Sequence, residues 1–195
     1  MNVNKLFDSS YDNILFDLDG TLIDSYEVIK SGLVLTLDYF NIEPKFDIGN
    51  HCVGPPLTEI FTLLSNNSDD KIITLMVNYF KEIYDEELYK LSHPFPHMNK
   101  LLLSLSTKKR LFLITNKREL PTKKILLLRN WANLFTDCYC VDTFVNERYC
   151  KADLINIMIS SHNLNKKSCI YVGDHSDDYI AANSAGISFL KVANY

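Results

Sequence analysis

The chain has 195 residues, a net charge of −4 and 47% hydrophobic residues, enough for one substantial core, or one core with a small inserted module, but not for two large domains. There is no basic excess to attract nucleic acid and no basic run that would bind anionic lipid. We therefore expect no nucleic-acid or membrane partner. No stretch approaches the roughly 20 apolar residues of a membrane-spanning helix, and residues 1–5 lack the apolar segment of a secretory signal. These features lead us to expect a cytoplasmic location.

The first predicted element is a strand at residues 13–16, a short apolar run bounded by polar residues, as in a fully buried parallel strand. A helix over residues 28–40 follows, and helical spacing of apolar residues continues around residues 57–64 and 72–83. Between about residues 24 and 91 the sequence carries almost no signal of a buried strand. We therefore predict a helical module, residues 24–91, inserted directly after the first strand.

The strand and helix alternation resumes after prolines at positions 94 and 96, which mark a connecting segment. A helix beginning at Met98 precedes a strand at 111–114, and Pro121 suits the first turn of a helix that reaches about residue 128. A helix after Lys151, a strand at 169–172, a helix that starts near Asp177 and ends just before Gly186, and a strand at 187–190 complete the chain. This order predicts an α/β fold, a doubly wound parallel sheet built from residues 1–23 and 92–195.

Polar motifs begin where the predicted strands end. The string DLDGT at residues 17–21 follows the first strand, Thr115 follows the second, and GDHSDD at residues 173–178 follows the third. The reactive crevice of an open α/β sheet forms beyond the carboxyl ends of its strands, so these motifs can converge. Crowded carboxylates repel one another and commonly hold a divalent cation. The pattern indicates Mg²⁺-assisted phosphoryl transfer.

These motifs resemble those of the haloacid dehalogenase superfamily, in particular its phosphoglycolate-phosphatase-like members with an inserted helical cap. The run DLDGTLIDS at residues 17–25 is similar to the first family motif, TNK at 115–117 to the second, Lys151 to the third, and Gly173-Asp174 with Asp178 to the fourth. The run VGPPL at residues 53–57 is similar to a cap segment of those phosphatases. The resemblance implies a Rossmann-like catalytic core with a helical cap at 24–91.

The resemblance also implies roles for the acidic residues. Asp17 is the expected nucleophile and forms an aspartyl-phosphate, while Asp19 protonates the leaving oxygen and later deprotonates the hydrolytic water. The expected Mg²⁺ is held by Asp17, Asp174 and the backbone carbonyl of Asp19. Asp178 is expected to hold the waters of the metal or the Lys151 ammonium.

Three further residues are expected to bind the substrate phosphate. Thr115 donates its hydroxyl, Asn116 lines the site and Lys151 supplies positive charge. Lys117 could reach the same crevice, and Ala152 stands where many relatives carry proline. We favour Lys151 because it lies between a strand-like segment and an amphipathic helix.

Other interpretations of the same residues remain open. A solvated turn could explain Asp17 and Asp19, whereas an EF-hand is disfavoured because Val28 occupies the position of its twelfth-residue glutamate. Capping of a helix could explain Asp174 and Asp178. We interpret His175 as an exposed loop residue and not as a metal ligand.

The expected function is hydrolysis of a small phosphorylated metabolite, similar to phosphoglycolate or a sugar phosphate. One alternative is a sugar-phosphate mutase, although the cap segment around residues 54–57 lacks the arginine of those relatives. The other is an inactive binding or regulatory protein on the same scaffold. Because the sequence ends shortly after the last predicted strand, we also consider a homodimer in which a partner chain covers the sheet.

The five cysteines, an odd number without a C-x-x-C pair, argue against a disulfide framework and against a zinc site. We expect buried, reduced thiols at all five positions, Cys52, Cys138, Cys140, Cys150 and Cys169.

Overall fold

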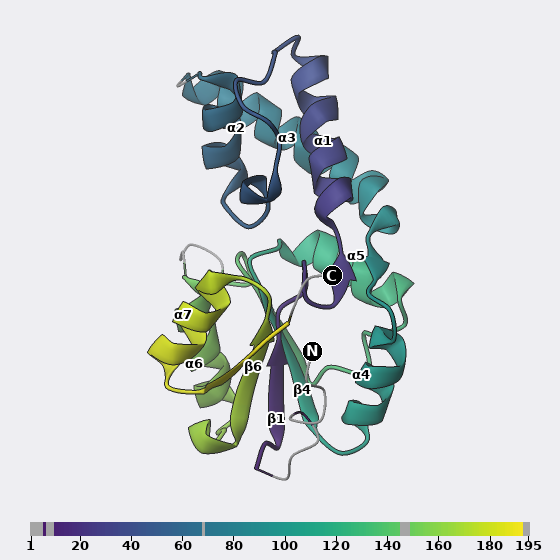
Figure 1. Cartoon of the computed structure of the whole chain (residues 1–195), viewed down its shortest axis with the longest axis vertical. Coiled ribbons are helices and arrows are strands. Elements are labelled where there is room, and N and C mark those ends of the chain that lie inside the picture. Colours follow the sequence, from purple (N-terminus) through teal and green to yellow (C-terminus); the bar gives the residue numbers. More distant parts are fainter. Residues whose placement is uncertain (1–5, 7–9, 68, 145–148, 193–195) are drawn as a thin grey trace. The chain divides into compact units, whose positions relative to one another are not determined.

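The computed structural model describes Leu6 and residues 10–67, 69–144 and 149–192. Residues 1–5, considered above for a secretory signal, lie outside this set. The chain forms two compact units, one of Met1–Asp24 with His93–Tyr195 and one of Ser25–Ser92 (Figure 1). The second unit begins and ends one residue later than the helical insert proposed from the sequence.

The first unit contains a five-stranded parallel sheet. Its strands stand in the order β5 (Asp137–Cys140), β4 (Arg110–Thr115), β1 (Asn13–Phe16), β6 (Cys169–Gly173) and β7 (Ser188–Lys191). All neighbouring strands are parallel, and Phe16 at the end of β1 is level with Leu113 on β4 and Val172 on β6. The predicted α/β fold with a doubly wound parallel sheet is confirmed, with β1 at its centre.

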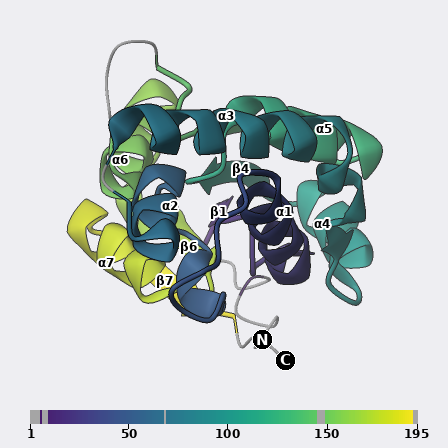
Figure 2. The ribbon, with the colours of Figure 1, turned by 90° about the horizontal axis from the view of Figure 1, so that it is seen from above.

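Helices cover both faces of this sheet. Figures 1 and 2 show α4 (Met98–Ser106) and α5 (Glu119–Leu128) on one side of the strands, and α6 (Lys151–Ser161) and α7 (Ser176–Ala185) on the other. On the second side, Leu15, Phe112 and Tyr171 pack against buried residues of α6 and α7 such as Leu154 and Ala182. β1, buried along its full length, reads as a continuous apolar run because both of its faces are covered.

Three short strands were not predicted from the sequence. β2 (Ile23–Asp24) and β3 (His93–Pro94) form a two-residue antiparallel pair, in which β3 lies in the segment that was expected to be a connection. Such short strands have no periodicity to detect. β5 has the sequence DCYC and lies at the edge of the sheet, where Asp137 and Cys138 remain partly accessible and polar residues are tolerated.

The second unit is helical and has its own core. It contains α1 (Tyr26–Tyr39), α2 (Leu57–Ser65) and α3 (Asp70–Glu86), with 3₁₀ turns η2 (Asn50–Cys52) and η3 (Leu88–Leu91); a further turn, η4 (Lys166–Ser168), belongs to the first unit. Phe61, Phe80 and Leu33 are among its buried residues. Gly32 lets α1 approach α3 closely, since a Cβ there would lie 2.7 Å from the Phe80 ring.

The cysteines are all free, but the expectation of uniform burial is wrong. Cys52, Cys140 and Cys169 are buried, whereas Cys138 is half-buried on the edge strand and Cys150 is exposed at the start of α6. An edge strand and a helix N-cap both leave a side chain near solvent. Among the described residues, the structure contains no helix that combines the length and apolar character needed to cross a membrane.

Candidate active site

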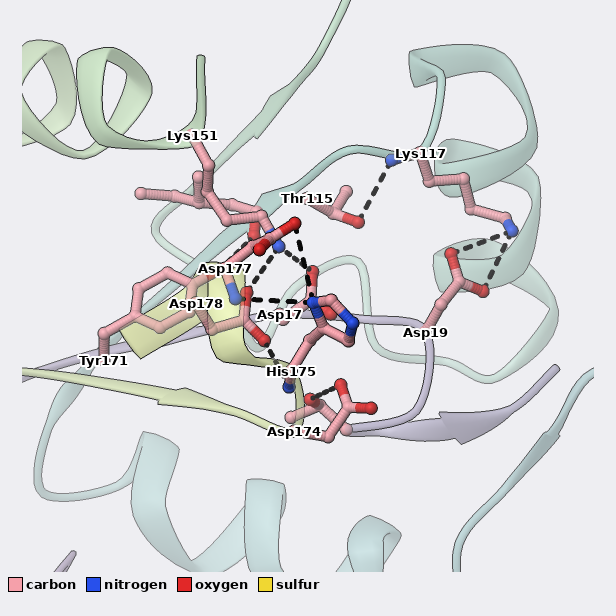
Figure 3. Close-up of polar contacts among 12 residues, drawn as sticks. Asp17, Asp19, Thr115, Lys117, Lys151, Tyr171, Asp174, His175, Asp177 and Asp178 are labelled. Atoms are coloured by element: carbon pink, nitrogen blue, oxygen red, sulfur yellow. Dashed lines mark hydrogen bonds and ion pairs between the residues drawn. The ribbon is translucent and has the colours of Figure 1, made fainter. Parts of the chain in front are cut away.

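The predicted motifs meet at the carboxyl edge of the sheet. Asp17 directly follows β1, Thr115 is the last residue of β4 and Asp174 directly follows β6. Lys151, the first residue of α6, points to the same edge (Figure 3). The parallel sheet therefore brings together side chains that are separated by up to 157 positions, counted from Asp17 to Asp174.

Lys151 connects two of the carboxylates. Its Nζ lies 3.0 Å from Oδ1 of Asp17 and 2.6 Å from Oδ1 of Asp178, and its side chain is only 9% exposed. Short charge-assisted contacts of this kind are the strong hydrogen bonds of protein interiors. The backbone N–H of Cys150 donates to the carboxylate of Asp153 and so caps the start of α6. This cap fixes the point from which the Lys151 side chain extends.

Asp17, Asp174 and Asp178 form an acidic cluster in which one oxygen of each carboxylate lies within 4.8 Å of the others. It is the one group of three or more potential metal ligands found in the described part of the chain. Three carboxylates with the Lys151 ammonium leave a formal charge of −2. That charge and the oxygen ligands suit a hard divalent cation such as Mg²⁺.

The backbone around the cluster is built for close approach. Gly20 has φ +76°, and a Cβ on it would collide with the carboxylate of Asp174. A Cβ on Gly173 would likewise collide with the carboxylate of Asp178. Thr21 donates its hydroxyl to Oδ1 of Asp174 at 3.2 Å. The two glycines thus make room for the carboxylates that the neighbouring polar groups orient.

The electrostatics of the cluster are unfavourable for Asp17. Burial raises the pKa of its carboxyl to about 7, the carboxylates of Asp178 and Asp19 act in the same direction, and the Lys151 ammonium opposes them. Burial by itself would lower the pKa of Lys151, but the negative charge of Asp17 and of Asp178 raises it well above 10.5. A buried, poorly compensated carboxylate at a sheet edge is typical of functional sites.

Asp178 has two partners. Its Oδ1 accepts from Lys151, and its Oδ2 accepts from the backbone N–H of His175 at 3.0 Å, which closes a capping box at the start of α7. The capping interpretation considered for Asp178 is therefore correct, and it coexists with the contact to Lys151. His175 is the N-cap residue of α7 and is exposed, so Asp174 lies just outside the helix.

Asp19 lies apart from the acidic cluster and pairs with a different lysine. Both of its carboxylate oxygens lie 3.0 Å from Nζ of Lys117. The backbone N–H of Lys117 donates to the Thr115 hydroxyl at 3.2 Å, and Asn116 between them is exposed. From the sequence, Lys117 was considered as a residue that lines the crevice and as a rival of Lys151, and no contact was assigned to Thr21. Both residues lie in the motifs quoted from the sequence, and this was the signal that could have pointed to them. Which carboxylate each one contacts depends on the tertiary structure.

Comparisons with known proteins show what this chain is similar to. The family model described as haloacid dehalogenase-like hydrolase matches residues 14–192. The chain is 29% identical over 185 residues to a phosphoglycolate phosphatase of Vibrio cholerae, covering 89% of this chain and 80% of that protein. It is 28% identical over 184 residues to a 5′-nucleotidase of Pseudomonas aeruginosa, covering 93% and 82%. A solved structure of a haloacid dehalogenase-like hydrolase from Streptococcus pneumoniae superposes with a TM-score of 0.83 at 26% identity, covering 95% of this chain and 86% of that one.

Proposed function

Because this chain belongs to the haloacid dehalogenase-like hydrolases, an enzyme family in which the relatives named above are phosphatases, we propose that it is a Mg²⁺-dependent phosphatase. It hydrolyses a small phosphorylated metabolite through an aspartyl-phosphate on Asp17. The observation that carries this proposal is the buried Asp17 carboxylate, held by Lys151 within an acidic cluster at the carboxyl edge of the sheet. The expectation of a phosphatase enzyme is confirmed at the level of the family; the metal and the substrate belong to the proposal.

Asp17 acts as the nucleophile. One of its oxygens forms a bond to phosphorus while the ester P–O bond breaks, and the leaving oxygen takes a proton from Asp19. Water then attacks phosphorus, Asp19 removes its proton, and the bond between phosphorus and Asp17 breaks to release phosphate. The reaction is balanced by one water per ester and leaves both aspartates as they began.

Positive charge and hydrogen-bond donors stabilise the transferring phosphoryl group. Lys151 lies against Asp17 and offsets the repulsion between a carboxylate and an anionic phosphate. The Thr115 hydroxyl and the exposed Asn116, at the end of β4, supply donors for the phosphoryl oxygens. Phosphoryl transfer depends mainly on such positioning and charge neutralisation.

Asp17, Asp174 and the backbone carbonyl of Asp19 would hold Mg²⁺. When bound, the cation neutralises charge on the phosphoryl oxygens. The fit rests on the charge of the cluster and on the space that Gly20 leaves beside Asp174. Asp178 suits a supporting role, since each of its oxygens already accepts a hydrogen bond from Lys151 or from His175.

The helical unit at 25–92 is proposed to act as a cap that selects small substrates and excludes polymers. Phosphoglycolate and nucleoside monophosphates are the first substrates to test, because relatives are named for activity on such compounds. We also propose a cytoplasmic location, supported by the free thiols. A homodimer remains a proposal, as does the absence of nucleic-acid and membrane partners.

A phosphate-release screen tests the proposal. The purified protein is assayed on phosphorylated metabolites with Mg²⁺ and with EDTA, beside Asp17→Asn. We expect release by wild type that requires Mg²⁺ and is lost in Asp17→Asn. Failure to release phosphate from every ester, or full activity of Asp17→Asn, would show the proposal to be wrong. Analysis of the products distinguishes hydrolysis from the mutase alternative, which returns an isomeric phosphate and no inorganic phosphate.

A further inference from the structure

The site contains two lysines that hold two different aspartates. Lys151 contacts Asp17 and Asp178, whereas Lys117 contacts Asp19. Figure 3 shows the Asp19 carboxylate turned toward Lys117, while Asp17 lies beside Lys151. The expected second and third motifs therefore each contribute one ammonium to one member of the aspartate pair.

The contact between Lys117 and Asp19 is well defined. Nζ lies 3.0 Å from both carboxylate oxygens, and the side chains are only 8% and 17% exposed. An ammonium between both oxygens restricts rotation of the carboxylate about its terminal torsion, which is otherwise broad. Burial strengthens the contact because water screens it little.

Asp19 needs such a restraint for its proposed role. It lies two residues from Asp17 at the same strand end. Its side chain is expected to reach the leaving oxygen, while only its backbone carbonyl is expected to reach the metal. An acid/base group displaced by even 1 Å loses much of its effect on the rate.

We propose that Lys117 is the positioning residue for Asp19: it holds the acid/base carboxylate apart from the nucleophile and aimed at the ester oxygen and the hydrolytic water. This inference rests on the proposed function. Lys117 acts through Asp19, whose carboxylate oxygens it contacts, so its effect appears only in steps that use Asp19.

A side-chain substitution isolates this role. The hydrogen bond from Lys117 to Thr115 uses the backbone N–H, so Lys117→Met retains it and removes only the ammonium. Met also keeps an unbranched apolar side chain in the largely buried position. The matched control is Lys123→Met on α5, whose ammonium is exposed and pairs with Glu119.

The experiment compares an aryl phosphate ester, whose leaving group departs without a proton, with an alkyl ester, whose leaving group needs one. With the alkyl ester, Lys117→Met should lower kcat by about 10- to 100-fold, within the range that a general acid contributes, and leave KM within about threefold. With the aryl ester, the first turnover should keep its rate and release a burst of phenolate, while the steady-state rate falls because Asp19 also serves hydrolysis of the aspartyl-phosphate.

Two further variants decide between positioning and a general structural effect. Lys117→Arg should restore most of the lost turnover, because a guanidinium can contact both oxygens of a carboxylate. The double variant Lys117→Met with Asp19→Asn should be no slower than Asp19→Asn alone. Additive losses, an equal slowing of the burst and the steady state, or unchanged kcat in Lys117→Met would each overturn the inference.

The failure of this inference is distinguishable from failure of the proposed function. If wild type releases no phosphate, the proposed function fails. If wild type is active, Asp17→Asn is inactive and Lys117→Met behaves like Lys123→Met, only the role of Lys117 fails. Melting temperatures of all variants confirm that the comparisons are made between folded proteins.

Discussion

Replacing Lys151 by Met should strongly destabilise the metal-free protein. The ammonium is 9% exposed and lies 3.0 Å from Asp17 and 2.6 Å from Asp178. At an effective dielectric constant of about 20, unit charges 3 Å apart attract by roughly 5 kcal/mol before the cost of desolvation is subtracted. Removing one partner of a buried ion pair costs about 3–5 kcal/mol, because the other charge stays buried. We expect a loss of that size in the free energy of unfolding at pH 8.

The loss should depend on pH. Burial already raises the pKa of Asp17 to about 7, and removing Lys151 removes the effect that opposes this rise. A carboxyl whose pKa is raised on folding favours the protonated folded state, so its contribution to stability is full at low pH and is lost as pH rises through the folded pKa. The destabilisation by Lys151→Met should therefore be smaller at pH 5 than at pH 8.

Trp131, the single tryptophan, reports on this unit. It is buried, and its indole N–H donates to Asn99 at 2.8 Å. Urea unfolding followed by its fluorescence in EDTA, at pH 5 and pH 8, measures both quantities. The exposed control Lys123→Met should unfold at the wild-type midpoint. A loss below about 1 kcal/mol at pH 8, or an equal loss at both pH values, would refute the electrostatic reasoning.

Three further predictions concern the same unit. Asp17→Asn should abolish phosphate release yet leave the metal-free unfolding midpoint unchanged or higher. It removes a buried carboxylate whose pKa burial raises to about 7, while Lys151 keeps the carboxylate of Asp178 as its partner; a clearly lower midpoint would contradict this. Gly20→Ala should raise the Mg²⁺ concentration needed for half-maximal activity by about tenfold or more, since its Cβ would strike the Asp174 carboxylate. The control Gly54→Ala should leave this concentration unchanged, because Gly54 also has a positive φ but no atom lies within 4 Å of the added Cβ. Burial raises the pKa of the Cys169 thiol from 9.0 to about 11, so the contribution of this thiol to stability is full below pH 9 and is lost as pH rises through about 11. Above pH 9, Cys169→Val should therefore lose stability less steeply than wild type in urea titrations, and an identical decline would exclude this thiol as a cause.

Much of the fold follows from local sequence. The run at residues 13–16 is apolar at every position, and β1 is buried along its full length at the centre of the sheet. The helical spacing between residues 28 and 83 corresponds to α1, α2 and α3. Local patterns suffice here because a buried strand and an amphipathic helix each need a distinctive order of apolar residues. β2, β3 and β5 could not be predicted in this way, because strands of two residues and a polar edge strand have no distinctive order of apolar residues.

The sequence by itself determined which residue types stand at the strand ends, and thus the acidic motifs and the family that they resemble. The contact of Lys151 with Asp178, one of the two roles expected for Asp178, is present, but the sequence could not decide which lysine contacts Asp17 and which contacts Asp19. Lys117 and Lys151 were rivals for one position, and the structure gives each a separate partner, Asp19 for the first and Asp17 with Asp178 for the second. The reason is physical: an ammonium pairs with the carboxylate that the packing of β4, α6 and α7 brings within about 3 Å, and that distance exists only in the folded chain.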